Sequence, residues 1–115
     1  MGGPIVLVAA PNVAFRRSIT FVLASERLET EAHSDATSAF ASARAHCAVC
    51  AVIDDGAVEN WEEAPEQFER FARPIILLVS LFGKVPDAPM LKQLVKPFLG
   101  EPLIKTVRDV IAGGH

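Results

Sequence analysis

The segment Ala48-Val-Cys-Ala-Val-Ile-Asp-Asp-Gly-Ala-Val58 decides how the rest of the chain is interpreted. Residues 49–53 are apolar without alternation, which predicts a central parallel strand covered on both faces. Asp54, Asp55 and Gly56 end this run with residues that are typical of turns. Ligands of open α/β sheets bind outside the carboxyl ends of the strands, so the two carboxylates stand where such a fold has its site. Turn residues are also common at strand ends, and composition alone favours a plain loop start here.

Length and composition indicate one folded domain. The chain has 115 residues, 50% of them apolar, and a net charge of −3. We expect a single domain over residues 4–112, large enough to bury a core. The chain has no Lys/Arg cluster and no apolar run of membrane-spanning length, which argues against nucleic acid and membranes as partners. Because the N-terminus also lacks the features of a signal peptide, a cytoplasmic location is expected.

Apolar segments along the chain alternate between strand and helix patterns. Besides the central strand, we expect strands at residues 4–9, 28–33, 73–80 and 94–95. Helices are expected at residues 13–25, 35–47, 65–72 and 100–111, where apolar side chains recur at helical spacing. The first of these helices should carry Arg16 and Arg17 on its outer side. The second, which Ser34 or Asp35 can cap, should bury Ala43, and the third, with Pro65 in its first turn, should bury Ala72. Five strands that alternate with helices predict an α/β fold with a doubly wound parallel sheet.

The segment Phe82–Leu91 is the irregular part of this pattern. It contains two prolines and Gly83, so we expect a loop or a single helical turn, and a fourth helix that is short or missing. Its apolar side chains, such as Met90, would then be exposed. Exposed apolar groups of this kind mark contact surfaces, so the segment is an expected surface for a partner.

Cys47 and Cys50 form a C-x-x-C spacing. A redox pair of this kind normally stands where a strand leads into a helix N-terminus, whose dipole lowers the thiol pKa. Here the order is reversed, because a helix leads into a strand. A zinc site would need two more ligands, and His46 is the only nearby candidate. We therefore interpret both cysteines as small buried apolar residues.

With its strands placed, the chain resembles the receiver domain of two-component response regulators, from about Pro4 to Ala112. Three features carry the resemblance: Asp54 at the end of the central strand, the run Pro74-Ile-Ile-Leu-Leu-Val-Ser80, and the turn Val95-Lys-Pro-Phe98. The segment from Ser80 to Gly83 is similar to receivers attached to hybrid kinases, which also tend to have a poor fourth helix. The resemblance implies a flavodoxin-like receiver fold and a role in signalling, not an enzyme.

The resemblance assigns roles to individual residues. It implies that Asp54 is a phosphoacceptor, which would attack a phosphohistidine on a partner and become an acyl phosphate. Lys96 would pair with the incoming phosphoryl oxygens. Asp55 would offer its backbone carbonyl to Mg²⁺ beside the Asp54 carboxylate. The switch hydroxyl of the family falls on Val79 here, with Ser80 next to it as the substitute.

Several positions depart from the family pattern. Receivers hold Mg²⁺ with two adjacent acidic residues after the first strand, but here the segment is Val8-Ala-Ala-Pro-Asn12 and supplies no carboxylate in either register. Gln93 stands where the family has an aromatic residue. Protein sites for Mg²⁺ depend on carboxylates, and charge neutralisation by the ion is much of phosphoryl transfer. We therefore expect Mg²⁺ binding to be weak.

Three hypotheses follow from these residues. The favoured one is a degenerate receiver in phosphorelay signalling that binds a histidine kinase, a phosphotransfer protein or a second copy of the chain, with weak or no phosphorylation. The alternative is an ordinary receiver that accepts phosphate on Asp54. The third is an unrelated flavodoxin-like binder or small enzyme, which the chain argues against because it has no Gly-rich phosphate loop and no nucleophile elbow.

Overall fold

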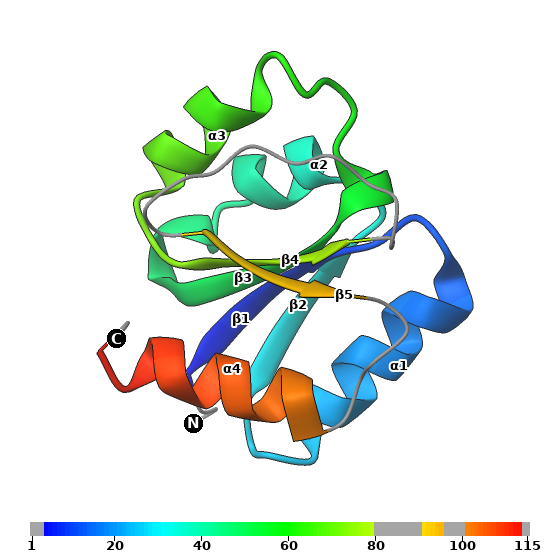
Figure 1. The fold of residues 1–115 in the computed structure, drawn as a ribbon, viewed down its shortest axis with the longest axis vertical. Coiled ribbons are helices and arrows are strands. Elements are labelled where there is room, and N and C mark those ends of the chain that lie inside the picture. Colours follow the sequence, from blue (N-terminus) through cyan, green and yellow to red (C-terminus); the bar gives the residue numbers. More distant parts are fainter. Residues whose placement is uncertain (1–3, 80–90, 96–100, 114–115) are drawn as a thin grey trace.

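The computed structural model describes residues 4–79, 91–95 and 101–113, and its centre is a five-stranded parallel sheet (Figure 1). The strand order is β2-β1-β3-β4-β5. The strands are β1 (Ile5–Ala9), β2 (Glu29–His33), β3 (Ala48–Asp54), β4 (Ile75–Val79) and β5 (Leu91–Val95). This order confirms the predicted doubly wound sheet, because the chain winds outward from β1 and β3 toward both edges.

Four described helices cover the two faces of the sheet. They are α1 (Val13–Ala24), α2 (Ala36–Ala41), α3 (Ala64–Phe71) and α4 (Glu101–Ile111), and two short 3-10 turns, η1 (Ala45–Cys47) and η2 (Asp55–Ala57), flank β3. In Figure 1, α2 and α3 lie on one face, and α1 and α4 lie on the other. None of the described helices is long and apolar enough to cross a membrane.

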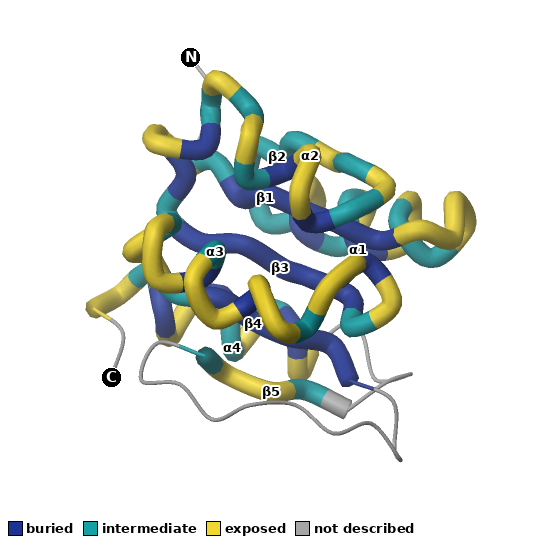
Figure 2. The backbone as a smooth tube through the Cα atoms, turned by 90° about the horizontal axis from the view of Figure 1, so that it is seen from above, coloured by how far each residue is buried: buried dark blue, intermediate teal, exposed yellow. Residues whose placement is uncertain are grey.

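The core has two layers because successive side chains of each strand point to opposite faces. Leu7 of β1 and Ile53 of β3 pack beneath α2 and α3, whereas Val8 and Val52 pack beneath α1 and α4. All four side chains are fully buried. Figure 2 shows the buried backbone following the central strands, with more exposed strands at the two edges. Burial on both faces explains why the central strand is apolar without alternation.

Helix starts follow the capping residues in the sequence. The side-chain oxygen of Asn12 accepts a hydrogen bond from the N–H of Phe15 at 2.8 Å, which caps α1. Asp35 caps α2 in the same way, with the N–H of Ser38 at 2.7 Å. Pro65 lies in the first turn of α3. The predicted roles of Asp35 and Pro65 are therefore confirmed.

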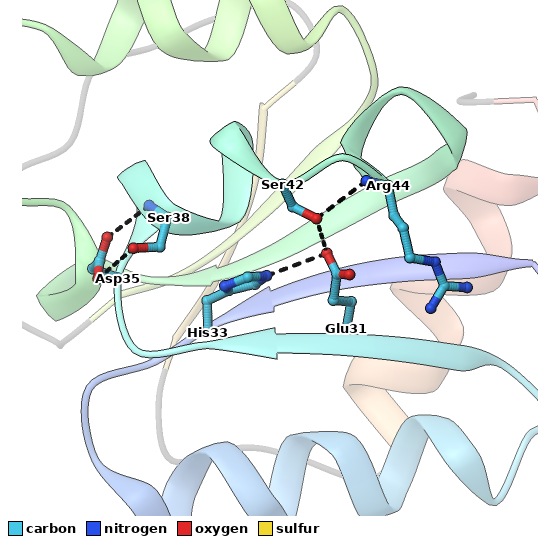
Figure 3. A network of polar contacts seen from close by, with 6 residues as sticks. All are labelled: Glu31, His33, Asp35, Ser38, Ser42 and Arg44. Atoms are coloured by element: carbon cyan, nitrogen blue, oxygen red, sulfur yellow. Dashed lines mark hydrogen bonds and ion pairs between the residues drawn. The ribbon is translucent and has the colours of Figure 1, made fainter.

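The predicted end of the second helix near residue 47 is wrong, because α2 stops at Ala41. Ser42 leaves the helix with an extended backbone, and its hydroxyl donates to the carboxylate of Glu31 on β2 (Figure 3). The same hydroxyl oxygen accepts the N–H of Arg44 at 3.1 Å. These contacts pull the chain off the helical path. Ala43, which was expected to be inward, is consequently exposed.

Two further boundaries differ from the sequence prediction. Ala72 was expected on the inner face of α3, but it is exposed and ends the helix in the left-handed region at φ 59°. The fifth strand begins at Leu91 instead of Leu94, so it is longer than predicted. The loop or turn predicted from Phe82 onward lies outside the described residues.

Candidate functional site

The ends of β1 and β3 form the switch point of the sheet. These two strands are neighbours, with Ala9 of β1 paired with Ile53 of β3. The connection after β1 passes through α1 on one face, and the connection after β3 passes through α3 on the other. Such a divergence leaves a crevice at the carboxyl ends of the two strands, which is the usual binding place of this architecture. The register puts Asp54 at this crevice.

Asp54 is the last residue of β3 and is only 6% exposed. It is the one charged residue that is buried in the part of the chain that the structure describes. A carboxylate is costly to bury unless it is hydrogen-bonded or paired. In keeping with this, no buried side-chain nitrogen or oxygen of the described residues lacks a hydrogen-bond partner. Asp54 is therefore a buried, hydrogen-bonded carboxylate at the end of β3, not a solvated loop residue.

Gly56 fits closely against this carboxylate. A Cβ atom at position 56 would lie 3.1 Å from Oδ2 of Asp54 and 3.6 Å from Cγ of Pro11. The 3-10 turn η2 thus folds back over the end of β3, and the loop after β1 meets it there. Because any side chain at position 56 would press on the carboxylate, the absence of a Cβ allows this close approach.

The end of β1 and the residue after it have methyl groups in place of acids. Ala9 and Ala10 are fully buried, and their methyl groups offer no ligand atoms. The side-chain oxygen of Asn12 already caps α1. Nη1 of Arg16 donates a hydrogen bond to the carbonyl of Ala10 at 2.7 Å. Arg16 was expected on the outer side of α1, but its side chain is partly buried and its guanidinium holds this loop through the hydrogen bond to Ala10.

The described residues do not fit a tightly held Mg²⁺ ion. Asp54 supplies one carboxylate, and the backbone carbonyl of Asp55 accepts a hydrogen bond from the N–H of Val58 at 3.3 Å within η2. Across residues 4–79, 91–95 and 101–113, no group of three His, Cys, Asp or Glu side chains is placed to hold a metal. Since Mg²⁺ sites depend on anionic oxygen ligands, this donor set is poor.

The predicted site residues fall into two groups. Asp54 lies at the carboxyl end of the central strand, as expected, and Asp55 follows it in η2. Val79, at the end of β4, is buried with the core residues beneath α2 and α3. Ser80 and Lys96 lie outside the described residues, so their closeness to Asp54 stays a prediction.

Sequence reasoning did not anticipate two contributors to the site. The sequence pattern marks Gly56 as a turn residue, and its place directly after an Asp-Asp pair is the signal for a close backbone approach. Helical spacing puts Arg16 on the outer face of the helix. Its contact with the carbonyl of Ala10 depends on a side chain reaching back along the helix to its own entry loop, which helical spacing does not reveal.

The two cysteines lie in different environments. Cys50 is fully buried beneath α1 and α4, and burial raises the pKa of its thiol to about 12. Cys47 is exposed at the end of η1. The apolar interpretation is therefore confirmed for Cys50, while burial of Cys47 is wrong.

Comparisons with known proteins agree with this architecture. A response regulator receiver domain protein from Clostridium thermocellum superposes with a TM-score of 0.81 at 16% identity, covering 96% of this chain and 95% of that one. The receiver domain of the hybrid histidine kinase CckA superposes with a TM-score of 0.73 at 16% identity, covering 93% of this chain and 98% of that one. At such identities these likenesses concern the fold.

A relative that is similar in sequence adds to the evidence for the family of this chain. The transcriptional regulator protein FixT of Rhizobium meliloti (strain 1021) is 30% identical over 113 residues, which cover 96% of each chain. No family model matches the chain. A receiver fold, an aspartate at the end of β3 and a relative similar over nearly the full length together place this chain in the response regulator receiver family, with FixT among its relatives.

Proposed function

We propose that this chain is a degenerate receiver of two-component phosphorelay signalling, which acts through protein–protein contacts and takes little or no Mg²⁺-dependent phosphorylation on Asp54. It binds its partner without catalysing a reaction of its own. The partner is a histidine kinase or a phosphotransfer protein, because receiver domains bind proteins of these two classes in a phosphorelay. The cytoplasmic location expected from the sequence belongs to the same proposal.

One observation carries the proposal. Where β1 ends beside Asp54, the chain has Ala9 and Ala10, both fully buried, and then Pro11 against Gly56. The two carboxylates that an ordinary receiver uses for Mg²⁺ have no counterpart there. Phosphoryl transfer depends on neutralising the charge that spreads over the phosphoryl oxygens. One aspartate, with alanines in place of the two acids, does little of this.

The name of the relative bears on the partner. FixT is called a transcriptional regulator. In the present chain the net charge is −3 and no Lys/Arg cluster is present in the sequence, which disfavours a direct contact with DNA. We therefore propose that any influence on transcription passes through a signalling protein.

The placement of Asp54 keeps the alternative function open. Its carboxylate stands at the switch point, at the end of the central strand, where a phosphoacceptor of this fold would be. In an ordinary receiver a carboxylate oxygen of Asp54 would attack the phosphorus of a phosphohistidine, and the P–N bond would break to release the imidazole. This alternative requires a cation at the crevice, which the described residues poorly support.

A magnesium titration combined with phosphodonor treatment tests the proposal. The protein is treated with acetyl phosphate at increasing Mg²⁺, and the mass of the intact chain is measured. We expect Mg²⁺ to bind at millimolar concentration or weaker, and labelling to be slow or absent. The variants Ala10→Asp and Ala10→Asn add side chains of similar volume directly after β1, with and without a charge. Once circular dichroism shows that both are folded, only Ala10→Asp should increase Mg²⁺ affinity.

Contact with a kinase forms the second arm of the test. An autophosphorylated histidine kinase or phosphotransfer protein is mixed with the wild type and with Asp54→Ala, and both binding and transfer are followed. Binding without transfer, unchanged in Asp54→Ala, supports the degenerate receiver. Tight Mg²⁺ binding with near-complete phosphorylation, lost in Asp54→Ala, refutes it and supports the ordinary receiver.

A further inference from the structure

A groove lies between the C-terminal end of α2, which stops at Ala41, and the C-terminal end of α3. It has a volume of about 600 Å³ and is lined from α2, from the segment through η1, and from the last turn of α3 with the residues that follow it. Ser42, where the chain leaves the helical path, is one of the residues that line this groove.

Phe40 and Phe71 give the groove an apolar wall. Their ring centroids lie 5.3 Å apart with the planes tilted by 46°, and Phe40 also meets Phe68 edge-on at 6.0 Å. Phe68 is buried in the core, so this aromatic cluster is anchored from below. Fixed aromatic side chains of this kind offer a large contact area at a small entropy cost.

The described residues that line the groove include two arginines and no acidic residue. Its residues are Thr37, Phe40, Ala41, Ser42, Ala43, Ala45, His46, Gln67, Arg70, Phe71, Ala72 and Arg73. The whole chain has 14 acidic residues and a net charge of −3, so the absence of Asp and Glu among these described lining residues is a local reversal of charge. The groove therefore complements an anionic group.

Arg73 is the cation best placed for this purpose. Its guanidinium donates a hydrogen bond to the carbonyl of His46 in η1 at 3.3 Å, and both residues line the groove. Arg70 is already paired with Glu66 one turn earlier on α3, at 2.7 Å. A guanidinium has five N–H donors, so Arg73 keeps donors for a bound carboxylate or sulfonate after its contact with His46.

We propose that this groove binds a small anionic amphiphile, whose apolar or aromatic body packs against Phe40 and Phe71 and whose anionic head contacts Arg73. The volume is in the range of about 300–1,000 Å³ that ligand pockets occupy. The site is separate from Asp54. Its lining residues Ala45 and His46 precede β3, whereas Asp54 ends that strand, so the seven residues of β3 separate the two places by about 20 Å.

The test uses 8-anilinonaphthalene-1-sulfonate, an aromatic anion whose fluorescence rises in apolar sites. We expect saturable binding of one dye per folded chain with a Kd of about 10–100 μM. Dodecanoate should displace the dye, and dodecanol, which has the same chain without the charge, should compete at least about fivefold less well. Backbone NMR signals of residues 40–46 and 70–73 should shift on binding.

Matched variants separate the charge from the fold. Arg73→Gln should weaken dye binding about fivefold, while Arg17→Gln, an exposed arginine on α1, should leave it unchanged. Ala43→Glu should weaken binding by repulsion, and Ala43→Gln should not; Ala43 is exposed, so both variants should fold. Equal competition by dodecanol, an unchanged Kd in Arg73→Gln, or NMR shifts confined to another surface would each overturn the proposal.

Discussion

Gly56 lies so close to Asp54 that a Cβ atom at position 56 would be 3.1 Å from Oδ2 of the carboxylate. Asp54 is 6% exposed, and Cγ of Pro11 would lie 3.6 Å from the same Cβ position. The carboxylate, the turn after β3 and the loop after β1 are thus packed into one unit. A substitution in any one of these three parts should therefore change the packing of the other two.

Gly56→Ala should destabilise the fold by about 1 kcal/mol, because the added methyl group would lie 3.1 Å from Oδ2 of Asp54 and must push that carboxylate aside. Urea denaturation measures the loss. The same substitution in an Asp54→Ala background serves as the control, since the obstructing oxygen is then absent. There Gly56→Ala should be neutral or stabilise the fold by about 0.5 kcal/mol through the lower entropy of the unfolded chain. An equal cost in both backgrounds would contradict the close contact.

Ser42→Ala should destabilise the fold by about 1–2 kcal/mol. The hydroxyl donates to the carboxylate of Glu31 and accepts the N–H of Arg44, so its removal leaves both groups without this partner. Chemical denaturation measures the difference. Ser18→Ala is the matched control, because that hydroxyl is exposed and bonds only to the carbonyl of Ala14 one turn earlier. It should change stability by no more than about 0.5 kcal/mol.

The same network predicts a dependence of stability on acid. The hydrogen bond from Ser42 is the largest cause that lowers the pKa of Glu31 below its ordinary value of 4.5. Burial raises this pKa, but His33 at 3.2 Å and Arg44 lower it further, so the net shift is downward. A depressed carboxyl pKa stabilises the fold above the unfolded pKa, and this contribution is lost as the pH falls through the folded pKa. Stability should therefore fall with pH from about 4.5 downward.

Glu31→Gln isolates this effect, because the amide keeps the shape and does not titrate. The stability difference between the wild type and Glu31→Gln should be largest near neutral pH and should shrink below about pH 4.5. Thermal melts from pH 3 to 7 measure it. A difference that stays constant over this range would show that the carboxylate charge of Glu31 is not what the network stabilises.

The sheet could be predicted from the sequence because apolar runs report burial directly. Residues 49–53 and 75–79 are apolar without a break, as expected for short strands covered on both faces. The position of Asp54 followed from the same rule, since it is the first charged residue after the central run. Capping by Asp35 was equally local, because the side chain bonds the N–H three residues on.

The end of α2 could not be predicted from local pattern. The segment Ala36–Ala45 is rich in alanine and favours a helix. What ends the helix is the contact of Ser42 with Glu31, a residue of another element, and this contact exists only once β2 and α2 have packed together. The approach of Pro11 to Gly56 has the same origin, since it depends on the register between β1 and β3. Both features are products of tertiary structure.

The two thiols should react very differently with a reagent such as 5,5′-dithiobis(2-nitrobenzoate). Cys50 is fully buried, and its pKa of about 12 leaves almost no thiolate at neutral pH, whereas Cys47 is exposed. Because the thiolate is the attacking species, one thiol per chain should react quickly in the native protein and a second only after unfolding in guanidinium. Cys47→Ser should abolish the fast phase, and Cys50→Ala should retain it. Two fast thiols in the native chain would mean that the β3 segment opens readily, which is incompatible with a strand buried on both faces.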